Sequence, residues 1–121
     1  MDKILKQSLL YDFYGELLTP NQKNIYEQYL VEDLSISEIA ANQSVSRQGI
    51  HDTIRRCEGI LEDYENKLQL VKRFVVIKNN VNCIEDLLNH YYNGEDKCNG
   101  DDVTKFIAEI RELSQNIIRE L

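Results

Sequence analysis

One segment near the middle of the chain carries the side chains best suited to binding chemistry. They are cations, hydroxyls and hydrogen-bonding rings or amides: Ser46, Arg47, Gln48, His51, Arg55 and Arg56. Arginine and glutamine match the donor and acceptor patterns of guanine and adenine edges in the major groove of DNA. A serine at a helix start, with the free amides beside it, can hold a phosphate. The segment therefore predicts a DNA-binding site and makes DNA the first candidate partner.

Catalytic and metal chemistry find little support. The sequence has no glycine-rich phosphate loop and no Gly-x-Ser-x-Gly motif, and neither His51 nor His90 has catalytic partners at a motif spacing. Cys57, Cys83 and Cys98 are odd in number, and no two of them have the spacing of a zinc site. We therefore expect no enzymatic activity, no cofactor, no metal site and reduced cysteines.

Two capped helix starts are predicted to position this segment. Ser35 opens a Ser-x-x-Glu capping box, and Ser46 caps the helix that follows. Ala40 is the small residue that two crossing helices need where they touch. Val45 is expected to fill the turn and to pack on Ile50, four positions into the second helix. Residues 35–56 are therefore interpreted as a helix-turn-helix.

The outward face of the second helix follows from its inward face. If Ile50, Ile54 and Cys57 point into the core, helix geometry turns Arg47, Gln48, His51, Asp52 and Arg55 outward. The first turn of such a helix usually reaches base edges, and cations farther along reach phosphates. An alternative stays open, because a domain of this shape can serve protein contact alone and Asp52 would repel phosphate.

Apolar periodicity predicts helices on both sides of this motif. A helix over about residues 2–17 has a stripe of apolar side chains, and Thr19, Pro20 and Gln22 mark the start of a helix that ends near residue 31. The inward residues expected in these two helices are Leu9, Leu10, Phe13, Leu17, Ile25, Tyr26, Tyr29 and Leu30.

Two heptad patterns follow, over residues 50–71 and 70–91, with a change of phase near residues 68–70 that predicts a break. Residues 93–100 have the composition of a loop, and Asp101 or Asp102 is expected to cap a last helix that ends at Leu121. The heptads either fold back within one chain or form a homodimer, and their length favours the homodimer. The predicted fold is all-α, with a helix-turn-helix domain over residues 1–68 and a helical extension for dimerisation or interaction over residues 69–121.

Composition limits the environment and the partners. The 121 residues are 42% hydrophobic, and no apolar run approaches the roughly 20 residues of a membrane span. The start of the chain lacks the apolar region of a signal peptide, so we expect a cytoplasmic protein without membrane contact. The net charge of −7 is unusual for a DNA-binding protein, and binding to phosphate would need a local basic patch.

Several short motifs within residues 9–73 resemble the YlxM family: Tyr11-Asp12-Phe13-Tyr14, Leu17-Leu18-Thr19, Asp33-Leu34-Ser35, Glu38-Ile39-Ala40 and Val45-Ser46-Arg47-Gln48. These are small bacterial proteins similar to the fourth region of sigma factors, and their genes lie beside those of the signal recognition particle. The resemblance implies a sigma-region-4-like helix-turn-helix without a wing, a regulatory role and no catalytic residues. It also implies the alternative of an accessory protein that binds signal recognition particle components and not DNA. Gln43 and Ser44 depart from the usual helix-turn-helix pattern, which favours a large apolar residue and a glycine there.

Overall fold

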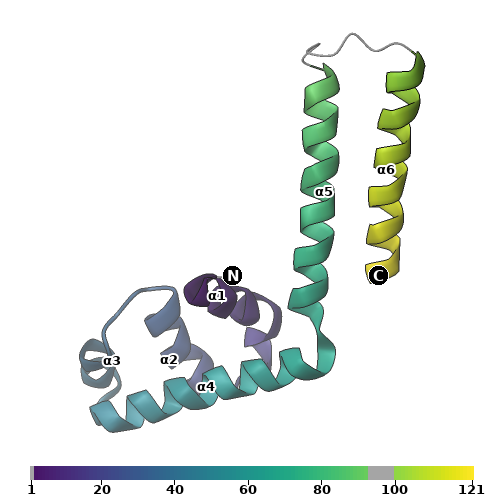
Figure 1. Cartoon of the computed structure of the whole chain (residues 1–121). Helices are drawn as coiled ribbons and strands as arrows, with labels where there is room; N and C mark the ends of the chain where they lie inside the picture. The colour runs from purple at the N-terminus through teal and green to yellow at the C-terminus, as the bar shows by residue number, and fades with distance from the viewer. Residues whose placement is uncertain (1, 93–99) are drawn as a thin grey trace. The chain divides into compact units, whose positions relative to one another are not determined.

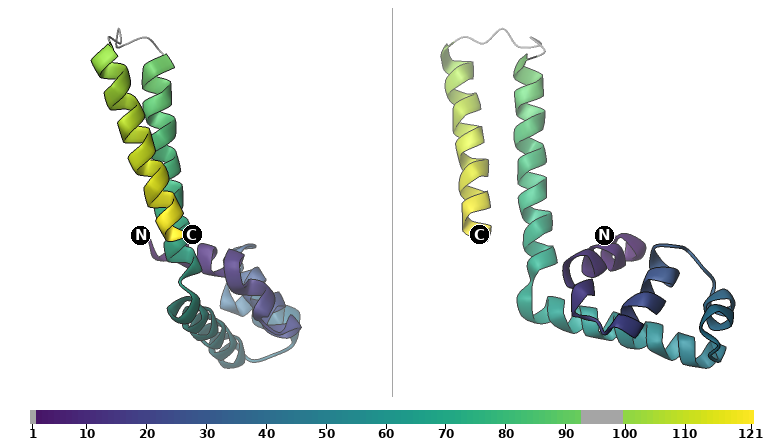
Figure 2. Two further views of the ribbon diagram at one scale, coloured as in Figure 1. Left: turned by 90° about the vertical axis from the view of Figure 1, so that its right-hand side faces the viewer. Right: turned by 180° about the vertical axis from the view of Figure 1, so that it is seen from behind.

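The computed structural model describes residues 2–92 and 100–121, and every regular element in these ranges is helical. The elements are α1 (Lys3–Tyr14), the 3-10 turn η1 (Gly15–Leu17), α2 (Pro20–Leu30), α3 (Ile36–Gln43), α4 (Arg47–Leu68), α5 (Leu70–Tyr92) and α6 (Gly100–Glu120). The all-α fold predicted from the sequence is thereby confirmed. The chain forms two compact units, residues 1–71 and 72–121, and each is described by itself (Figures 1 and 2).

The helix starts of the first unit lie where the sequence predicts them. Thr19 and Gln22 form one reciprocal capping box, and Ser35 and Glu38 form a second. The Ser46 hydroxyl accepts a 3.0 Å hydrogen bond from the amide of Gly49 and so caps α4. These side chains satisfy amides that have no partner within their own helix, and thereby fix where each helix begins.

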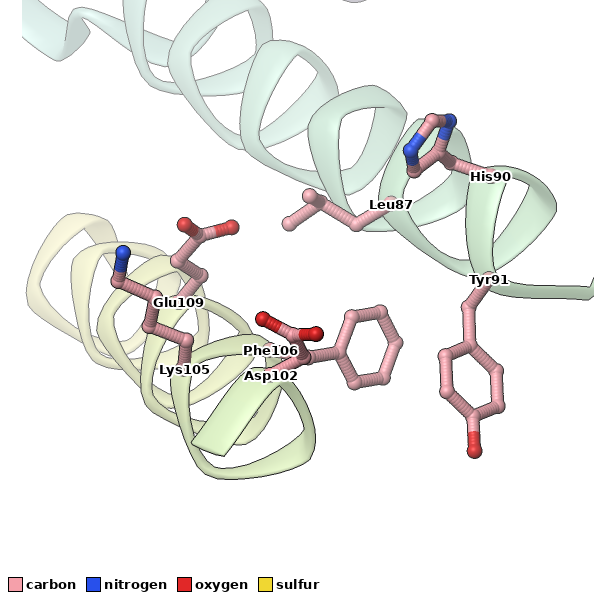
Figure 3. Close-up of a pocket in the computed structure, with 7 residues that line it drawn as sticks. All are labelled: Leu87, His90, Tyr91, Asp102, Lys105, Phe106 and Glu109. Carbon is pink, nitrogen blue, oxygen red and sulfur yellow. The ribbon is translucent and has the colours of Figure 1, made fainter. Parts of the chain in front are cut away.

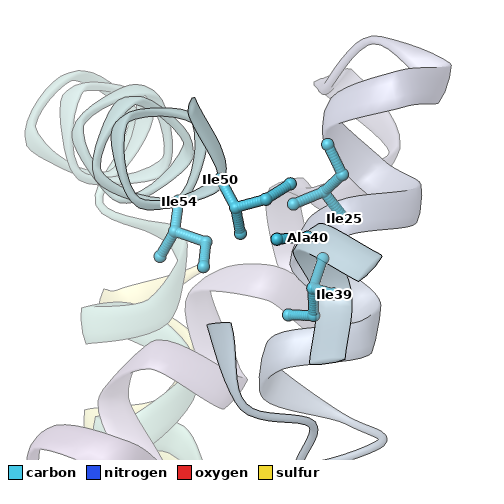
Figure 4. Close-up of a cluster of buried hydrophobic side chains, with 5 residues drawn as sticks. All are labelled: Ile25, Ile39, Ala40, Ile50 and Ile54. Carbon is cyan, nitrogen blue, oxygen red and sulfur yellow. The ribbon is translucent and has the colours of Figure 1, made fainter. Parts of the chain in front are cut away.

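In the first unit, α1, α2 and α3 all pack against the long helix α4 (Figure 1). The helix-turn-helix encloses a cluster of aliphatic side chains, shown in Figure 4, made of Ile25, Ile39, Ala40, Ile50 and Ile54. Ile39 and Ile50 are fully buried, and Ala40 of α3 is 7% exposed. Two helices at residues 36–43 and 47–68 joined by a short turn confirm the predicted helix-turn-helix.

The apolar stripe predicted for the first helix was partly wrong. Phe13 and Leu17 are exposed, whereas Tyr14 and Leu18 are buried together with Leu10. Tyr14 lies four residues after Leu10 on the same side of α1, and the chain continues through the tighter turn η1 at Gly15 to Leu18. A Cβ at residue 15 would lie 2.7 Å from the Tyr11 ring, so glycine allows the close approach of that ring.

Val45 does not fill the turn in the predicted way. It is 48% exposed, and its Cγ1 would lie 2.9 Å from a Cβ placed on residue 49. Val45 therefore covers Gly49 on the surface, while Ile50 points into the cluster of Figure 4. The turn is made instead by Ser44, whose backbone is left-handed, with φ 55° and ψ 41°.

The heptad pattern of α4 is used within the chain. Ile50, Ile54, Cys57 and Leu61 are buried against α1, α2 and α3, and Val71 continues this buried side. A coiled-coil homodimer through residues 50–71, which the sequence left open, is therefore wrong. The same helix face cannot pack on a second subunit while it forms the core of its own domain.

A single residue separates α4 from α5, as the change of heptad phase predicts. Gln69 ends α4 in the left-handed conformation, with φ 58° and ψ 26°. No glycine or proline stands at this break, so contacts with the rest of the first unit must hold it. The Tyr14 hydroxyl accepts a hydrogen bond from the Leu70 amide at 3.2 Å, and the Glu65 carboxylate accepts one from the Val71 amide at 3.0 Å.

The second unit is a helical hairpin in which α5 and α6 run antiparallel (Figure 2). Tyr91 and Phe106 stack with their ring centroids 4.9 Å apart, beside a groove of about 210 Å³ that Figure 3 shows. None of the side chains described in residues 72–121 is buried. Asp101 and Asp102 lie inside the first turn of α6, which begins at Gly100, so the prediction that one of them caps the helix was wrong. Of the predicted loop, residues 93–99 lie outside the described residues.

Candidate nucleic-acid interface

The first turn of α4 presents a small polar surface to solvent. Ser46, Arg47 and Gln48 are exposed there. The Gly49 amide already donates a hydrogen bond to the Ser46 hydroxyl. The amides of Arg47 and Gln48 also lie in the first turn, where no carbonyl of the same helix can accept their hydrogen bonds, so they remain available as donors. These two amides and the positive end of the helix dipole can hold an anion together.

Gly49 is a site residue that the sequence analysis missed. A Cβ at this position would come within 2.9 Å of Val45 Cγ1 and 3.2 Å of Ser46 Oγ. Glycine therefore allows the cap and the valine to close over the first turn of α4. The signal was available, because a glycine three residues after a serine cap is a poor helix former that needs a local reason.

The predicted site residues are all accessible, but they do not form one patch. Arg55 and Arg56 are exposed and His51 is half-buried. Arg47, His51 and Arg55 follow one another at four-residue steps, which places them in a row along one side of α4. Arg56 is about 100° away from Arg55 around the helix and faces a different direction.

The three arginines of this region carry charge that the domain leaves available. Among the described residues, no side-chain hydrogen bond or ion pair involves the guanidinium groups of Arg47, Arg55 or Arg56. By contrast, Lys6 pairs with Glu62 at 3.2 Å, and Lys23 pairs with Glu16. The arginines can therefore meet an external phosphate without breaking an ion pair.

The acidic residue of this face is engaged by its neighbours. Gln48 Nε2 donates a 2.8 Å hydrogen bond to Asp52 Oδ1, and His51 Nδ1 lies 4.0 Å from the same oxygen. The Asp52 charge remains on the surface, but one of its oxygens is occupied. This bond uses one of the two hydrogens of Gln48 Nε2, so the second hydrogen and Gln48 Oε1 remain available to a base.

Two lysines of α1 also bring positive charge to this region, which the sequence analysis did not predict. Lys3 and Lys6 lie beside Arg55 along a groove between α1 and α4. Only packing of two helices distant in the sequence brings them together. The surrounding charge is unfavourable overall, because residues 1–71 carry seven basic and twelve acidic side chains, a net charge of −5.

Within residues 2–92 and 100–121, no group of histidine, cysteine, aspartate or glutamate side chains could hold a metal ion. No helix in the same ranges is long and apolar enough to cross a membrane. The capped helix pair, its aliphatic core and the cationic start of α4 define a helix-turn-helix protein.

The chain belongs to the UPF0122 family, described as "Putative helix-turn-helix protein, YlxM / p13 like", whose model matches residues 1–100. The resemblance drawn from the motifs of residues 9–73 is thereby confirmed. A UPF0122 protein of Geobacillus sp. (strain WCH70) is 40% identical over 113 residues, which cover 93% of this chain and 98% of the relative. A UPF0122 protein of Geobacillus kaustophilus is 35% identical over 95% of this chain and 97% of its own length. One from Shouchella clausii is 49% identical over 74 residues, 61% of this chain and 68% of the relative.

Proposed function

We propose that this protein is a cytoplasmic DNA-binding regulator that places the first turns of α4 in the major groove. The observation that carries the proposal is the exposed Arg47 at a capped helix start, with Arg55 and Arg56 exposed farther along the same helix and none of the three in an ion pair within the described residues. Membership of a helix-turn-helix family supports it. Such helices read DNA with their N-terminal residues.

Each side chain has a distinct role in this proposal. Arg47 and Gln48 contact base edges, for which their donors and acceptors are suited. Ser46 and the free amides beside it bind one backbone phosphate, and Arg55 and Arg56 bind others farther along the duplex. His51 lies between the two groups and contributes a hydrogen bond.

Fluorescence anisotropy with genomic DNA fragments at about 50 and 200 mM salt tests this proposal. Phosphate contacts release counterions, so affinity is expected to fall steeply over this range. Arg47→Ala should weaken binding by about 10-fold or more, the effect of losing one good base contact. No binding at the lower salt would exclude the proposal.

Lys67→Ala is the matched control for Arg47→Ala. Lys67 is an exposed cation on the same helix, about 30 Å from Arg47 at 1.5 Å per residue. Its removal changes the net charge of the protein by the same amount, but it should leave DNA affinity nearly unchanged. Equal losses in the two variants would indicate general electrostatic attraction without a defined site.

A second candidate function is that of an accessory protein of the signal recognition particle that does not bind DNA. The net charge of −5 on residues 1–71 favours it, because an acidic helical surface attracts a basic protein or ribonucleoprotein. A pull-down with purified particle components, with and without nuclease, distinguishes the two functions. Absence of a salt-sensitive complex would count against this candidate.

We further propose that residues 72–121 form a homodimer with a second copy of the chain. Apolar side chains of both helices stay exposed, including Phe74 and Val81 of α5 and Ile107 and Ile118 of α6. Ile107 and Ile118 are eleven residues apart, three helical turns, and so share one face. Two hairpins packed on these faces would make a four-helix bundle, a common way to bury such stripes.

Solution mass measurement tests the homodimer. The wild-type protein should show about twice 14.2 kDa at micromolar concentration, and Ile118→Glu should restore the single-chain mass. Ile4→Glu is a control with the same exposure, because Ile4 and Ile118 are both 68% exposed, and it should leave the dimer intact. A wild-type protein of 14.2 kDa would exclude the proposal.

A further inference from the structure

The first unit contains a groove that borders the candidate DNA-binding surface and shares Arg55 with it. It runs between α1 and α4 and has a volume of about 430 Å³, within the size range of small-molecule sites. Its floor is apolar, with Leu10 and Leu61, and the fully buried Tyr26 of α2 lies beneath it. Lys3, Lys6 and Arg55 line it as cations, and Glu58 and Glu62 line it as anions.

The Tyr26 hydroxyl at this groove lacks a hydrogen-bond partner. Tyr26 is fully buried, and its hydroxyl is the one buried side-chain nitrogen or oxygen without a partner in the described part of the chain. A buried hydroxyl in this state is costly, so each example calls for an explanation. The comparable hydroxyl of Tyr14 is paired with Glu65 at 2.6 Å.

Packing holds the Tyr26 ring in place. The Tyr11 ring meets it edge to face, with centroids 5.8 Å apart, and the Tyr29 ring stacks at 6.3 Å. The Tyr11 hydroxyl is itself bonded to Glu27, which fixes that neighbour. The Tyr26 hydroxyl therefore cannot reach another partner by rotation of its side chain.

The state of this hydroxyl suits an anionic ligand. Burial and the nearby carboxylate of Glu58 raise the pKa of Tyr26 well above its usual range, so it stays protonated and can only donate to an anion. The groove has three cations against two carboxylates, and one of the carboxylates already pairs with Lys6. Arg55 and Lys3 have no ion-pair partner in the described residues.

We propose that this groove binds a phosphate group. Arg55 and Lys3 supply charge, and Lys6 exchanges its bond with Glu62 for one with the phosphate. The Tyr26 hydroxyl, buried beneath the floor, donates a hydrogen bond once the ligand displaces the side chains that cover it. Arginine and lysine both bind phosphate well, and a neutral hydroxyl adds direction to the contact. The phosphate belongs either to a soluble nucleotide or to the backbone of a DNA duplex, and only the second source rests on the proposed function.

Titration of the ¹⁵N-labelled full chain with inorganic phosphate, at ionic strength held constant with chloride, tests the site directly. Amides of residues 3–10 and 55–62 should shift and saturate. Lys3→Ala and Tyr26→Phe should each weaken binding by about fivefold, and Tyr26→Phe should at the same time leave the unfolding temperature equal or higher. Glu62→Gln should strengthen binding, because it removes an anion and frees Lys6.

Separate titrations with AMP and with a short DNA duplex identify the source of the phosphate. If a nucleotide is the ligand, AMP shifts the groove and Lys3→Ala leaves the salt dependence of DNA binding unchanged. If the duplex backbone is the ligand, Lys3→Ala lowers the slope of log affinity against log salt by about one. If the protein does not bind DNA but this groove does bind phosphate, the titrations with inorganic phosphate and with AMP should still show saturable shifts.

Two outcomes would overturn the proposal. One is the absence of saturable shifts with phosphate and AMP together with an unchanged salt slope in Lys3→Ala. The other is an equal loss of binding in Lys67→Ala, whose side chain lies outside this groove and serves as the control for general attraction.

Discussion

The Tyr14 hydroxyl donates a 2.6 Å hydrogen bond to Glu65 Oε1, which joins residues 51 positions apart in the sequence. Both side chains are buried, and they bond the amides of Leu70 and Val71 at the start of α5. The break between α4 and α5 is therefore held by α1, through one tyrosine and one carboxylate.

Tyr14→Phe should destabilise the first unit by about 2 kcal/mol. The substitution leaves the buried Glu65 carboxylate without its hydroxyl donor and the Leu70 amide without its acceptor, and hydrogen bonds to charged groups are worth about 1.5–3 kcal/mol. Urea denaturation measures the loss. Tyr64→Phe is the control, because the Tyr64 ring stacks on Tyr14 and its hydroxyl has no bond in the described residues. Equal effects of the two substitutions would contradict this role of Tyr14.

Ser44→Gly should stabilise the protein by about 1 kcal/mol. Ser44 ends α3 with φ 55°, a conformation that costs an L-residue about 1–2 kcal/mol and costs glycine little. Thermal unfolding followed by circular dichroism measures the change. Ser37→Gly, at an exposed position in the first turn of α3, should have the opposite sign, because glycine is a poorer helix former than serine. A loss of stability in Ser44→Gly would be inconsistent with this turn.

Ala40→Leu should cost about 1–3 kcal/mol, since extra methylene groups do not fit a closely packed core. Ala40 is 7% exposed within the cluster of Figure 4. The next residue gives a matched control, because Ala41 is exposed and Ala41→Leu should change stability by less than about 0.5 kcal/mol. Urea midpoints compare the two. Similar midpoints would mean that α3 and α4 do not cross closely at Ala40.

Stability should fall at alkaline pH, in part through Cys57. Burial, followed by the nearby Glu58 carboxylate, raises the pKa of the Cys57 thiol from 9.0 to about 11. The folded state then binds this proton more tightly than the unfolded state, so the contribution is complete below pH 9 and is lost as pH rises to about 11. Urea denaturation at pH 8 and pH 10.5 measures the decline, which should be smaller in Cys57→Ala. Identical declines would show that the thiol does not titrate in this range.

Sequence reasoning recovered the features that depend on local chemistry. Thr19, Ser35 and Ser46 identify helix starts because a capping side chain acts within three residues of itself. The break near residue 69 is visible as a change of heptad phase. In α4, the inward positions of Ile50 and Ile54 place Arg47 and Arg55 on the outside, since one helical period fixes both.

Features that depend on contacts between distant segments were not recovered. The sequence does not show which side of α1 the rest of the domain covers, so Phe13 was placed inside and Tyr14 was overlooked. Nor does it show that a buried glutamate, Glu65, has a tyrosine partner from α1. The repeat of apolar residues along a helix shows that one face is apolar, but it does not show which neighbour covers that face. The heptads of residues 50–71 were therefore compatible with a homodimer.

The Gln48–Asp52 hydrogen bond has a consequence for selectivity. It uses one of the two hydrogens of Gln48 Nε2, so the other hydrogen and Oε1 stay available to a base. The bond also holds the glutamine in one orientation, so its side chain loses less conformational freedom when it binds an adenine. Discrimination at that base pair would then come from a glutamine that is oriented in advance, and a base that does not match this orientation would bind less well.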